Sequence, residues 1–188
     1  MSDTHDLIER WRLGDQRAAE QLYAQTRERV FRLAFGLLGN SEDAEEAAQD
    51  ALSYALVNID KFDPDRARFT TWLHTITVSR VRDRQRRKRF SLTSLAEWMA
   101  GGRDVSADTP RTEQRMTQQV ARDEVWSAVQ TLSPVLREAI VLRYWAQHSF
   151  REMAEILDCP MGTAQSRVRR GFEQLAKELS ADLLRDFE

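Results

Sequence analysis

The chain has 188 residues, of which 41% are hydrophobic and 31% are charged, with only 7 Gly and 4 Pro. This composition is typical of a helix-rich globular protein and excludes a fibrous or low-complexity chain. No segment approaches the ~18 apolar residues that a membrane-spanning helix needs, and the first residues lack the apolar core of a signal peptide. We therefore expect a cytoplasmic protein with no direct insertion into a membrane.

The sequence lacks the groups of residues on which most enzyme sites are built. Its one cysteine, Cys159, cannot form an intramolecular disulfide, and the three histidines, His5, His74 and His148, are far apart in the sequence. There is no Cys/His cluster with zinc-like spacing, no Gly-rich phosphate loop and no nucleophile–base pair. We expect a protein that is not an enzyme and that has no cofactor and no metal site. A cysteine in a turn beside proline is more typical of packing than of redox sensing.

The first half predicts helices and shows no alternating strand pattern. We expect these helices over residues 15–38, 41–58 and 69–88. Asp15 and Ser41 are suitable N-caps for the first two, and Gly39-Asn40 separates them. The stretch Asp60–Asp65 predicts a turn before the third helix, whose apolar positions fall on one face.

The net charge of −2 conceals two adjacent blocks of opposite sign. Residues 41–60 contain six acidic residues and no Lys or Arg, whereas residues 80–89 contain seven basic residues and one Asp. Such a pattern favours one surface for a basic protein partner and another for nucleic acid. The alternative is a pair of solvated helix faces whose charges pair with each other.

A linker is expected between two domains, because Gly, Ser and Pro accumulate after Phe90. Four apolar residues near its start are unusual for a spacer and indicate a short helix or a docking segment: Leu92, Leu95, Trp98 and Met99. Whether such a segment docks on this chain or on a partner stays open. The predicted fold is all-α, with an N-terminal helical bundle at 10–89, a flexible linker at 90–115 and a C-terminal helix-turn-helix domain at 116–180.

Clear boundary signals divide the second half into helices. Ser133-Pro134 opens a helix that runs to about Trp145, since proline is favoured at the first helical position. Residues 149–152 form a capping box for a helix that ends near Leu157. After a tight connection, Thr163 is expected to cap a last helix to about Leu179. The helix, short turn and helix at 149–179 have the size of a helix-turn-helix motif.

The last helix has an apolar stripe and a basic outer face. At ~100° per residue the stripe consists of Ala164, Val168, Gly171, Leu175 and Leu179. The opposite side and its flanks present one hydroxyl and three guanidinium groups, from Ser166, Arg167, Arg169 and Arg170. A helix that enters the DNA major groove requires such donors, because Arg binds guanine O6 and N7 or phosphates. The alternative is a solvated basic face on an ordinary helical hairpin.

Four segments resemble the extracytoplasmic-function (ECF) sigma factors, the smallest class of the sigma-70 family. In the second half these are LSPVLREAIVLRYW and SFREMAEILDCPMGTAQSRVRRGFEQL. In the first half they are SEDAEEAAQDALSYAL and FDPDRARFTTWLHTITVSRVRDRQRR. The resemblance covers about residues 15–89 and 120–180.

The resemblance implies an RNA polymerase sigma factor that directs promoter-specific transcription initiation, with region 2 in the first half and region 4 in the second. Its polymerase-binding residues, which contact the basic clamp helices of the β′ subunit, would be Glu46, Gln49 and Asp50. Its residues for −10 DNA would be Lys61, Arg68, Ser79, Arg80, Arg84 and Arg87. Its residues for −35 DNA would be Thr163, Gln165, Ser166, Arg167, Arg169 and Arg170. The β flap would support region 4, and an anti-sigma factor, in many family members a membrane-bound protein, would hold the chain inactive.

The chain departs from the family pattern at positions that bear on promoter choice. Ser79 stands where the family usually has Asn, and Gln165 replaces the usual Lys or Arg, which favours adenine over guanine or phosphate. Ala47, Ala48 and Ala51 make the polymerase-binding helix leaner than usual. The promoter sequence therefore stays open.

Two other functions fit part of the pattern. One is a dimeric helix-turn-helix repressor or activator, although the acidic segment at 41–60 argues against it. The other is a sigma-like adaptor that binds polymerase but opens no promoter.

Overall fold

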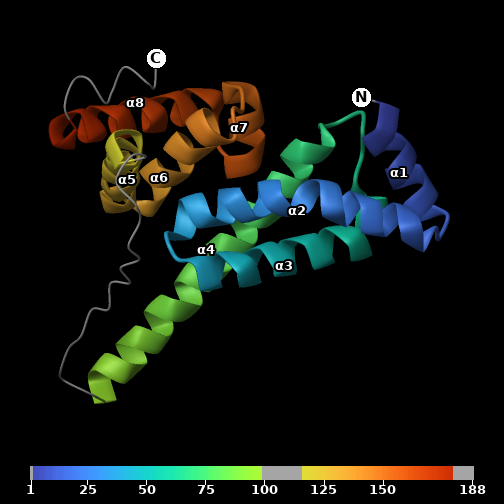
Figure 1. The fold of residues 1–188 in the computed structure, drawn as a ribbon, viewed down its shortest axis with the longest axis horizontal. Coiled ribbons are helices and arrows are strands. Elements are labelled where there is room, and N and C mark those ends of the chain that lie inside the picture. Colours follow the sequence, from blue (N-terminus) through green and yellow to red (C-terminus); the bar gives the residue numbers. More distant parts are fainter. Residues whose placement is uncertain (1, 99–115, 180–188) are drawn as a thin grey trace.

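The computed structural model describes residues 2–98 and 116–179 (Figure 1). Over these residues every regular element is helical, and none of the helices is long and apolar enough to cross a membrane. The first half contains α1 (Ser2–Arg12), α2 (Gln16–Leu38), α3 (Ser41–Val57), the 3-10 turn η1 (Ile59–Lys61) and α4 (Phe69–Trp98). The second half contains α5 (Met116–Thr131), α6 (Pro134–Ile140), the π-helical turn η3 (Val141–Trp145), α7 (Phe150–Leu157) and α8 (Met161–Glu178). The predicted all-α fold is confirmed.

Two of the predicted helix starts are confirmed by their caps. The Asp15 carboxylate accepts hydrogen bonds from two backbone N–H groups in the first turn of α2. At the start of α7 the Ser149 hydroxyl accepts from the Glu152 N–H, and the Glu152 carboxylate accepts from the Ser149 N–H at 2.9 Å. This reciprocal pair is the capping box expected from the sequence, and it satisfies two N–H groups that the helix itself leaves free.

Two other predicted caps are wrong by a few residues. The cap of α3 is Asn40 rather than Ser41, because Gly39 adopts a φ of 71° and turns the chain one residue earlier. The Asn40 side chain then accepts a hydrogen bond of 2.9 Å from a backbone N–H in the first turn. Helix α8 begins two residues before the predicted cap, Thr163, because Pro160 with its φ of −56° already provides the entry conformation.

The helical segments extend further than the sequence pattern predicts. The pattern does not predict α1, which buries Leu7 and Ile8 against Ala18 and Leu22 of α2. Helix α4 continues to Trp98 instead of ending near residue 88, so residues 90–98 of the predicted linker are helical. Residues 99–115, the remainder of that linker, lie outside the described part of the chain.

Small side chains allow α3 to approach α2 and α4 closely. The buried face of α3 consists mainly of alanine, at Ala44, Ala47, Ala48, Ala51 and Ala55. The alanine face contacts larger apolar residues that include Val30 of α2 and Leu73 of α4. The alanines that make α3 lean are therefore the residues that pack it between its neighbours.

The largest apolar core is shared by the two halves of the chain. Its members include Leu33 and Leu37 of α2, Val78 and Val81 of α4, Val129 of α5, Ile140 of α6, Val141 of η3, Met153 and Ile156 of α7, and Val168 and Leu175 of α8. At Gly36 the approach is so close that an added Cβ would lie 2.8 Å from Val141 Cγ1. The Phe35 ring also stacks on Trp126 with centroids 4.8 Å apart. The C-terminal helices are therefore docked on α2 and α4, and we call this the closed arrangement (Figure 1).

Substitution of a glycine on α8 tests the packing of the C-terminal half. An added Cβ at Gly171 would lie 2.7 Å from Ile140 Cγ1, whereas one at Gly162 of the same helix meets nothing within 4 Å. We expect Gly171→Ala to lower the free energy of unfolding by roughly 1–3 kcal/mol, as overpacking of a core does. We expect Gly162→Ala to cause no loss, because Ala favours the helix. Urea unfolding of both variants measures the difference, and equal stability would contradict the described contact between α6 and α8.

Candidate nucleic-acid interface

The acidic face of α3 and the basic face of α4 lie side by side and partly neutralise each other. Asp43 is buried, and its carboxylate accepts from Arg84 Nε at 2.8 Å and from the Lys88 ammonium group. Arg84 also donates to Glu46 through its second nitrogen. Burial alone raises the pKa of Asp43, but the hydrogen bonds from Lys88 and Arg84 outweigh it and hold the pKa below its usual value. For these residues the alternative, in which the two charge blocks pair with each other, is correct.

The next turn of α3 is left open to solvent. Gln49 and Asp50 are exposed, and within the described residues Asp50 forms no ion pair. On α4 the Arg87 side chain is likewise exposed and has no carboxylate partner among the described residues. Among the residues whose side chains are described, the two helices thus retain a free acidic patch at Gln49 and Asp50 and a free cation at Arg87.

Tyr54 is a residue of this surface that the sequence analysis missed. Its ring lies on α3 and is 37% exposed, with the Arg80 guanidinium 4.4 Å and the Lys61 Nζ 5.7 Å from the ring centroid. Arg80 and Lys61 come from α4 and η1, so the ring joins three elements through cation–π contacts. The signal available in the sequence was an aromatic residue one helical turn after Asp50, on a face otherwise occupied by polar and charged side chains.

Ser79 is exposed and lines a groove between α4 and the C-terminal half. The groove has a volume of about 720 Å³, and its walls include Val135, Asp158 and Arg167 of the second half. Arg82, on the same face of α4, donates two hydrogen bonds of 2.8 and 2.6 Å to Glu138 of α6, which is 5% exposed. The predicted −10 position Ser79 and the predicted −35 position Arg167 therefore line one groove.

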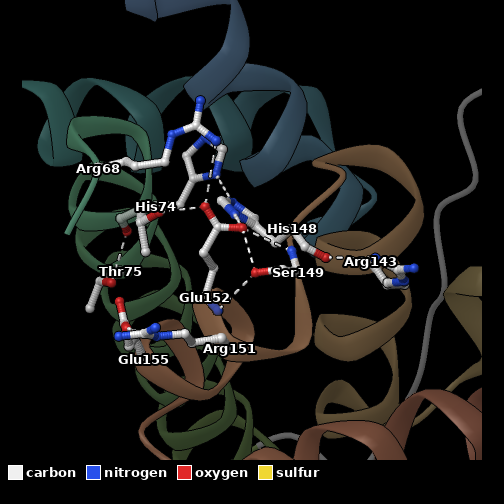
Figure 2. A network of polar contacts seen from close by, with 10 residues as sticks. Arg68, His74, Thr75, Arg143, His148, Ser149, Arg151, Glu152 and Glu155 are labelled. Atoms are coloured by element: carbon white, nitrogen blue, oxygen red, sulfur yellow. Dashed lines mark hydrogen bonds and ion pairs between the residues drawn. The ribbon is translucent and has the colours of Figure 1, made fainter.

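A polar network joins the two halves beside this groove (Figure 2). Its centre is Glu152 of α7, which accepts hydrogen bonds from the Ser149 hydroxyl at 2.8 Å and from the Thr71 hydroxyl of α4 at 3.2 Å. Arg68 lies 3.8 Å from the same carboxylate. Burial alone raises the pKa of Glu152, but the hydrogen bonds from the Ser149 N–H, the Ser149 hydroxyl and the Thr71 hydroxyl outweigh it and hold the pKa below its usual value. The carboxylate thus stays charged, and Arg68, another predicted −10 residue, lies near it while its side chain remains mostly exposed.

Two buried histidines complete the network. His74 Nδ1 of α4 lies 2.7 Å from His148 Nε2, and the two rings are nearly perpendicular. Burial, followed by the nearby charges, lowers the pKa of His74 to about 3. Burial also lowers the pKa of His148, although Glu152 opposes this effect. Both rings are therefore neutral in the closed arrangement at neutral pH.

Helix α8 presents part of its predicted DNA-reading face to solvent. Ala164, Val168, Gly171 and Leu175 are buried, so the predicted apolar stripe is confirmed at these positions. Three of the six predicted −35 residues are exposed: Gln165, Arg169 and Arg170. Arg169 lies 3.8 Å from Glu173, whereas Arg170 has no partner among the described residues.

The other three predicted −35 residues are half-buried. The Ser166 hydroxyl donates to the Thr163 carbonyl at 2.9 Å, and an Arg167 nitrogen lies 3.8 Å from the Cys159 sulfur. These local contacts tie the first turn of α8 to itself and to the preceding turn. Of the six predicted −35 residues, Gln165 and Arg170 are thus the two that are exposed and have no partner among the described residues.

Models of two sigma-70 segments match the chain. The model of sigma-70 region 2 matches residues 22–91, and the model of sigma-70 region 4 matches residues 122–175. The first match contains α3 and most of α4, and the second contains α7 and nearly all of α8. The candidate polymerase and −10 residues therefore fall within the first matched segment, and the candidate −35 residues fall within the second.

Curated relatives extend over almost the whole chain. The ECF RNA polymerase sigma factor SigW of Bacillus subtilis is 33% identical over 178 residues, which cover 92% of this chain and 94% of the relative. The ECF RNA polymerase sigma-E factor of Escherichia coli K12 is 32% identical over 176 residues and covers 90% of each chain.

Solved structures agree in fold. The sigma factor RpoE of Bartonella quintana, solved in complex with the anti-sigma factor NepR, is similar with a TM-score of 0.70 and 26% identity, over 87% of this chain and 97% of that one. CnrH, solved in complex with the cytosolic domain of CnrY, has a TM-score of 0.68 at 24% identity, over 96% of this chain and 99% of that one, which supports the fold alone. The two matched regions and the likeness to SigW show that the chain belongs to the ECF sigma factors of the sigma-70 family.

Proposed function

We propose that this chain binds core RNA polymerase and directs promoter-specific initiation, with no catalytic step of its own. The observation that carries the proposal is the outer face of α8, where Gln165 and Arg170 extend to solvent while the opposite stripe is buried. A helix with this division, preceded by the short α7, fits the major groove and reads the −35 element. The free acidic patch at Gln49 and Asp50, with the adjoining Glu46, binds the basic clamp helices of β′.

The −10 element binds along α4 and the turn before it. Single-stranded DNA needs a basic groove with aromatic surfaces, and the cluster of Tyr54, Lys61 and Arg80 supplies both. Arg87 adds a free cation to the same helix. Arg84 is held by Asp43 and Glu46, so its contact with DNA requires phosphate to replace one of these carboxylates, whereas Arg68 is already mostly exposed.

The closed arrangement is a state of the chain that is not bound to a promoter. The −10 and −35 elements are about 25 base pairs apart, which is about 85 Å of duplex at ~3.4 Å per base pair. Ser79 and Arg167, proposed to read one element each, line the same groove. The C-terminal helices must therefore leave α2 and α4 before both elements are bound. A relative has been solved with the anti-sigma factor NepR, and we propose that a partner of this class binds the closed chain in the cytoplasm.

Run-off transcription with core polymerase and a library of stress promoters tests the proposal. We expect stimulation of a subset of promoters, and no stimulation of any promoter would contradict the function. A dimeric repressor or activator would instead shift duplex DNA without polymerase. An adaptor that opens no promoter would bind polymerase but give no permanganate-reactive bases near −10.

Charge reversal on α3 tests the polymerase surface. We expect Asp50→Arg to abolish capture by core polymerase, because a cation would face the basic clamp helices, while the variant remains folded. Glu20→Arg reverses an exposed acid on α2 and serves as the control, with capture unchanged. Normal capture of Asp50→Arg in a pull-down would refute the acidic surface.

Removal of one guanidinium on α8 tests the recognition helix. We expect Arg170→Ala to cost about 1–3 kcal/mol in promoter binding by the holoenzyme if the side chain reads a base. Lys177→Ala, at the far end of α8, controls for loss of positive charge. Promoter titrations with −35 variants provide the measurement, and unchanged affinity and preference would show that Arg170 does not read the −35 element.

The Tyr54 ring is proposed to position Arg80 for the −10 strand. We expect Tyr54→Ala to weaken open-complex formation about two- to fivefold, the range expected for an exposed cation–π contact, whereas Tyr54→Phe keeps the ring and the activity. In an Arg80→Ala background the effect of Tyr54→Ala should disappear. Additive losses in permanganate footprints of the four proteins would show that Tyr54 does not act through Arg80.

A further inference from the structure

A pair of histidines lies where the two halves of the chain meet. His74 belongs to α4 and is 2% exposed, and His148 precedes α7 and is 4% exposed. Their facing nitrogens are 2.7 Å apart. Figure 2 shows that the pair lies beside the Glu152 carboxylate, so contacts from both halves converge on it.

The hydrogen bond between the rings requires neutral histidine. Glu152 Oε2 lies 3.7 Å from His148 Nδ1 and favours a proton on that nitrogen. His148 Nε2 then carries a lone pair and accepts from the His74 Nδ1–H. If both rings were protonated, each facing nitrogen would carry a hydrogen and the bond could not form. A proton on His74 Nε2 would also be buried without an acceptor, since that atom has no hydrogen-bond partner in the described chain.

Burial is the main effect that opposes protonation of both rings, and the charges around them act in both directions. The charged groups that face the pair from the surrounding elements are Glu28, Arg29 and Arg32 of α2, Arg68 ahead of α4, Arg143 of η3 and Glu152 of α7. Arg29 disfavours a charge on either ring, and Arg68 disfavours one on His148. Glu152 favours the charged rings, but the Ser149 and Thr71 donors and Arg68 already occupy its oxygens.

We propose that the His74–His148 pair is an acid-sensitive switch that stabilises the closed arrangement while both rings are neutral and opens it when they are protonated. The proposal concerns the equilibrium between closed and open chain. Only its effect on transcription rests on the function proposed above.

The direction of the pH effect follows from the two states. In the closed arrangement the pKa of His74 is about 3 and that of His148 is lowered, whereas in an open chain both rings are hydrated and titrate near their ordinary value of about 6.5. The open chain therefore binds more protons in acid. The contribution of the pair to closure is complete above pH ~6.5 and is lost as the pH falls from there toward the closed-state values. At pH ~5.5 the protonation of His74 should raise the ratio of open to closed chain about tenfold, and the protonation of His148 should raise it further.

The experiment follows the titration and the size of the full-length chain together, without polymerase or DNA. NMR reports the pKa of each histidine, and small-angle X-ray scattering reports the radius of gyration from pH 7.5 to 4.5. We expect the pKa values of His74 and His148 in the closed arrangement to lie below the ordinary histidine value. The radius of gyration should be compact at pH 7.5 and should increase over the pH range in which the pair titrates.

Two variants separate the pair from other acid effects. His5→Gln removes a histidine outside the interface and should keep the expansion, whereas the double variant His74→Gln, His148→Gln should have a radius of gyration that does not change over the same range. The proposal is overturned if the wild type is extended at pH 7.5, if its size is unchanged while the pair titrates, or if the double variant still expands. Failure of promoter stimulation would leave these results intact, so the proposed function and the switch can fail separately.

Discussion

The docking of the C-terminal helices on α2 and α4 is the constraint on which the rest of the structure depends. Its apolar part is the shared core, with η3 pressed against Gly36. Its polar part includes the bidentate ion pair between Arg82 and the almost fully buried Glu138. A buried ion pair contributes little net stability, but leaving one partner unpaired is costly. The ion pair therefore favours one register of α6 on α4 over the alternative registers, while the apolar contacts stabilise the docking itself.

The same docking leaves much of each proposed contact surface exposed. Among the described residues, Asp50 of α3, Arg87 of α4 and Arg170 of α8 are exposed in the closed arrangement. Ser79 and Arg167, one from each proposed DNA surface, line the groove between the halves. The docking therefore restricts the distance between the two proposed DNA surfaces rather than the exposure of either one.

Much of the fold was predictable because its determinants are local. The Asp15 cap, the Ser149–Glu152 capping box and the apolar stripe of α8 each depend on residues within a few positions of one another, and each is confirmed. Tyr54 was missed, and the pairing of the two charge blocks stayed an open alternative, because both arise from the packing of α3 on α4, which side-chain spacing within one helix does not specify. The contact between His74 and His148 was unpredictable for the same reason, since 74 positions separate the two rings. Of the predicted contact residues, the −35 set lies along one helix, whereas the −10 set is spread over η1, the turn before α4 and α4 itself, and both sets stay predictions.

A substitution at Gly36 would change the stability of the closed arrangement. It lies inside a long helix, where Ala would stabilise the helix itself by up to about 1 kcal/mol, yet a Cβ there would meet Val141 at 2.8 Å. A single codon change at this position would favour α2 as a helix and oppose the docking of η3, and it would alter no side chain proposed to touch DNA or polymerase. The resting ratio of closed to open chain can therefore diverge between related proteins by substitution at one buried site, independently of the promoters that they read.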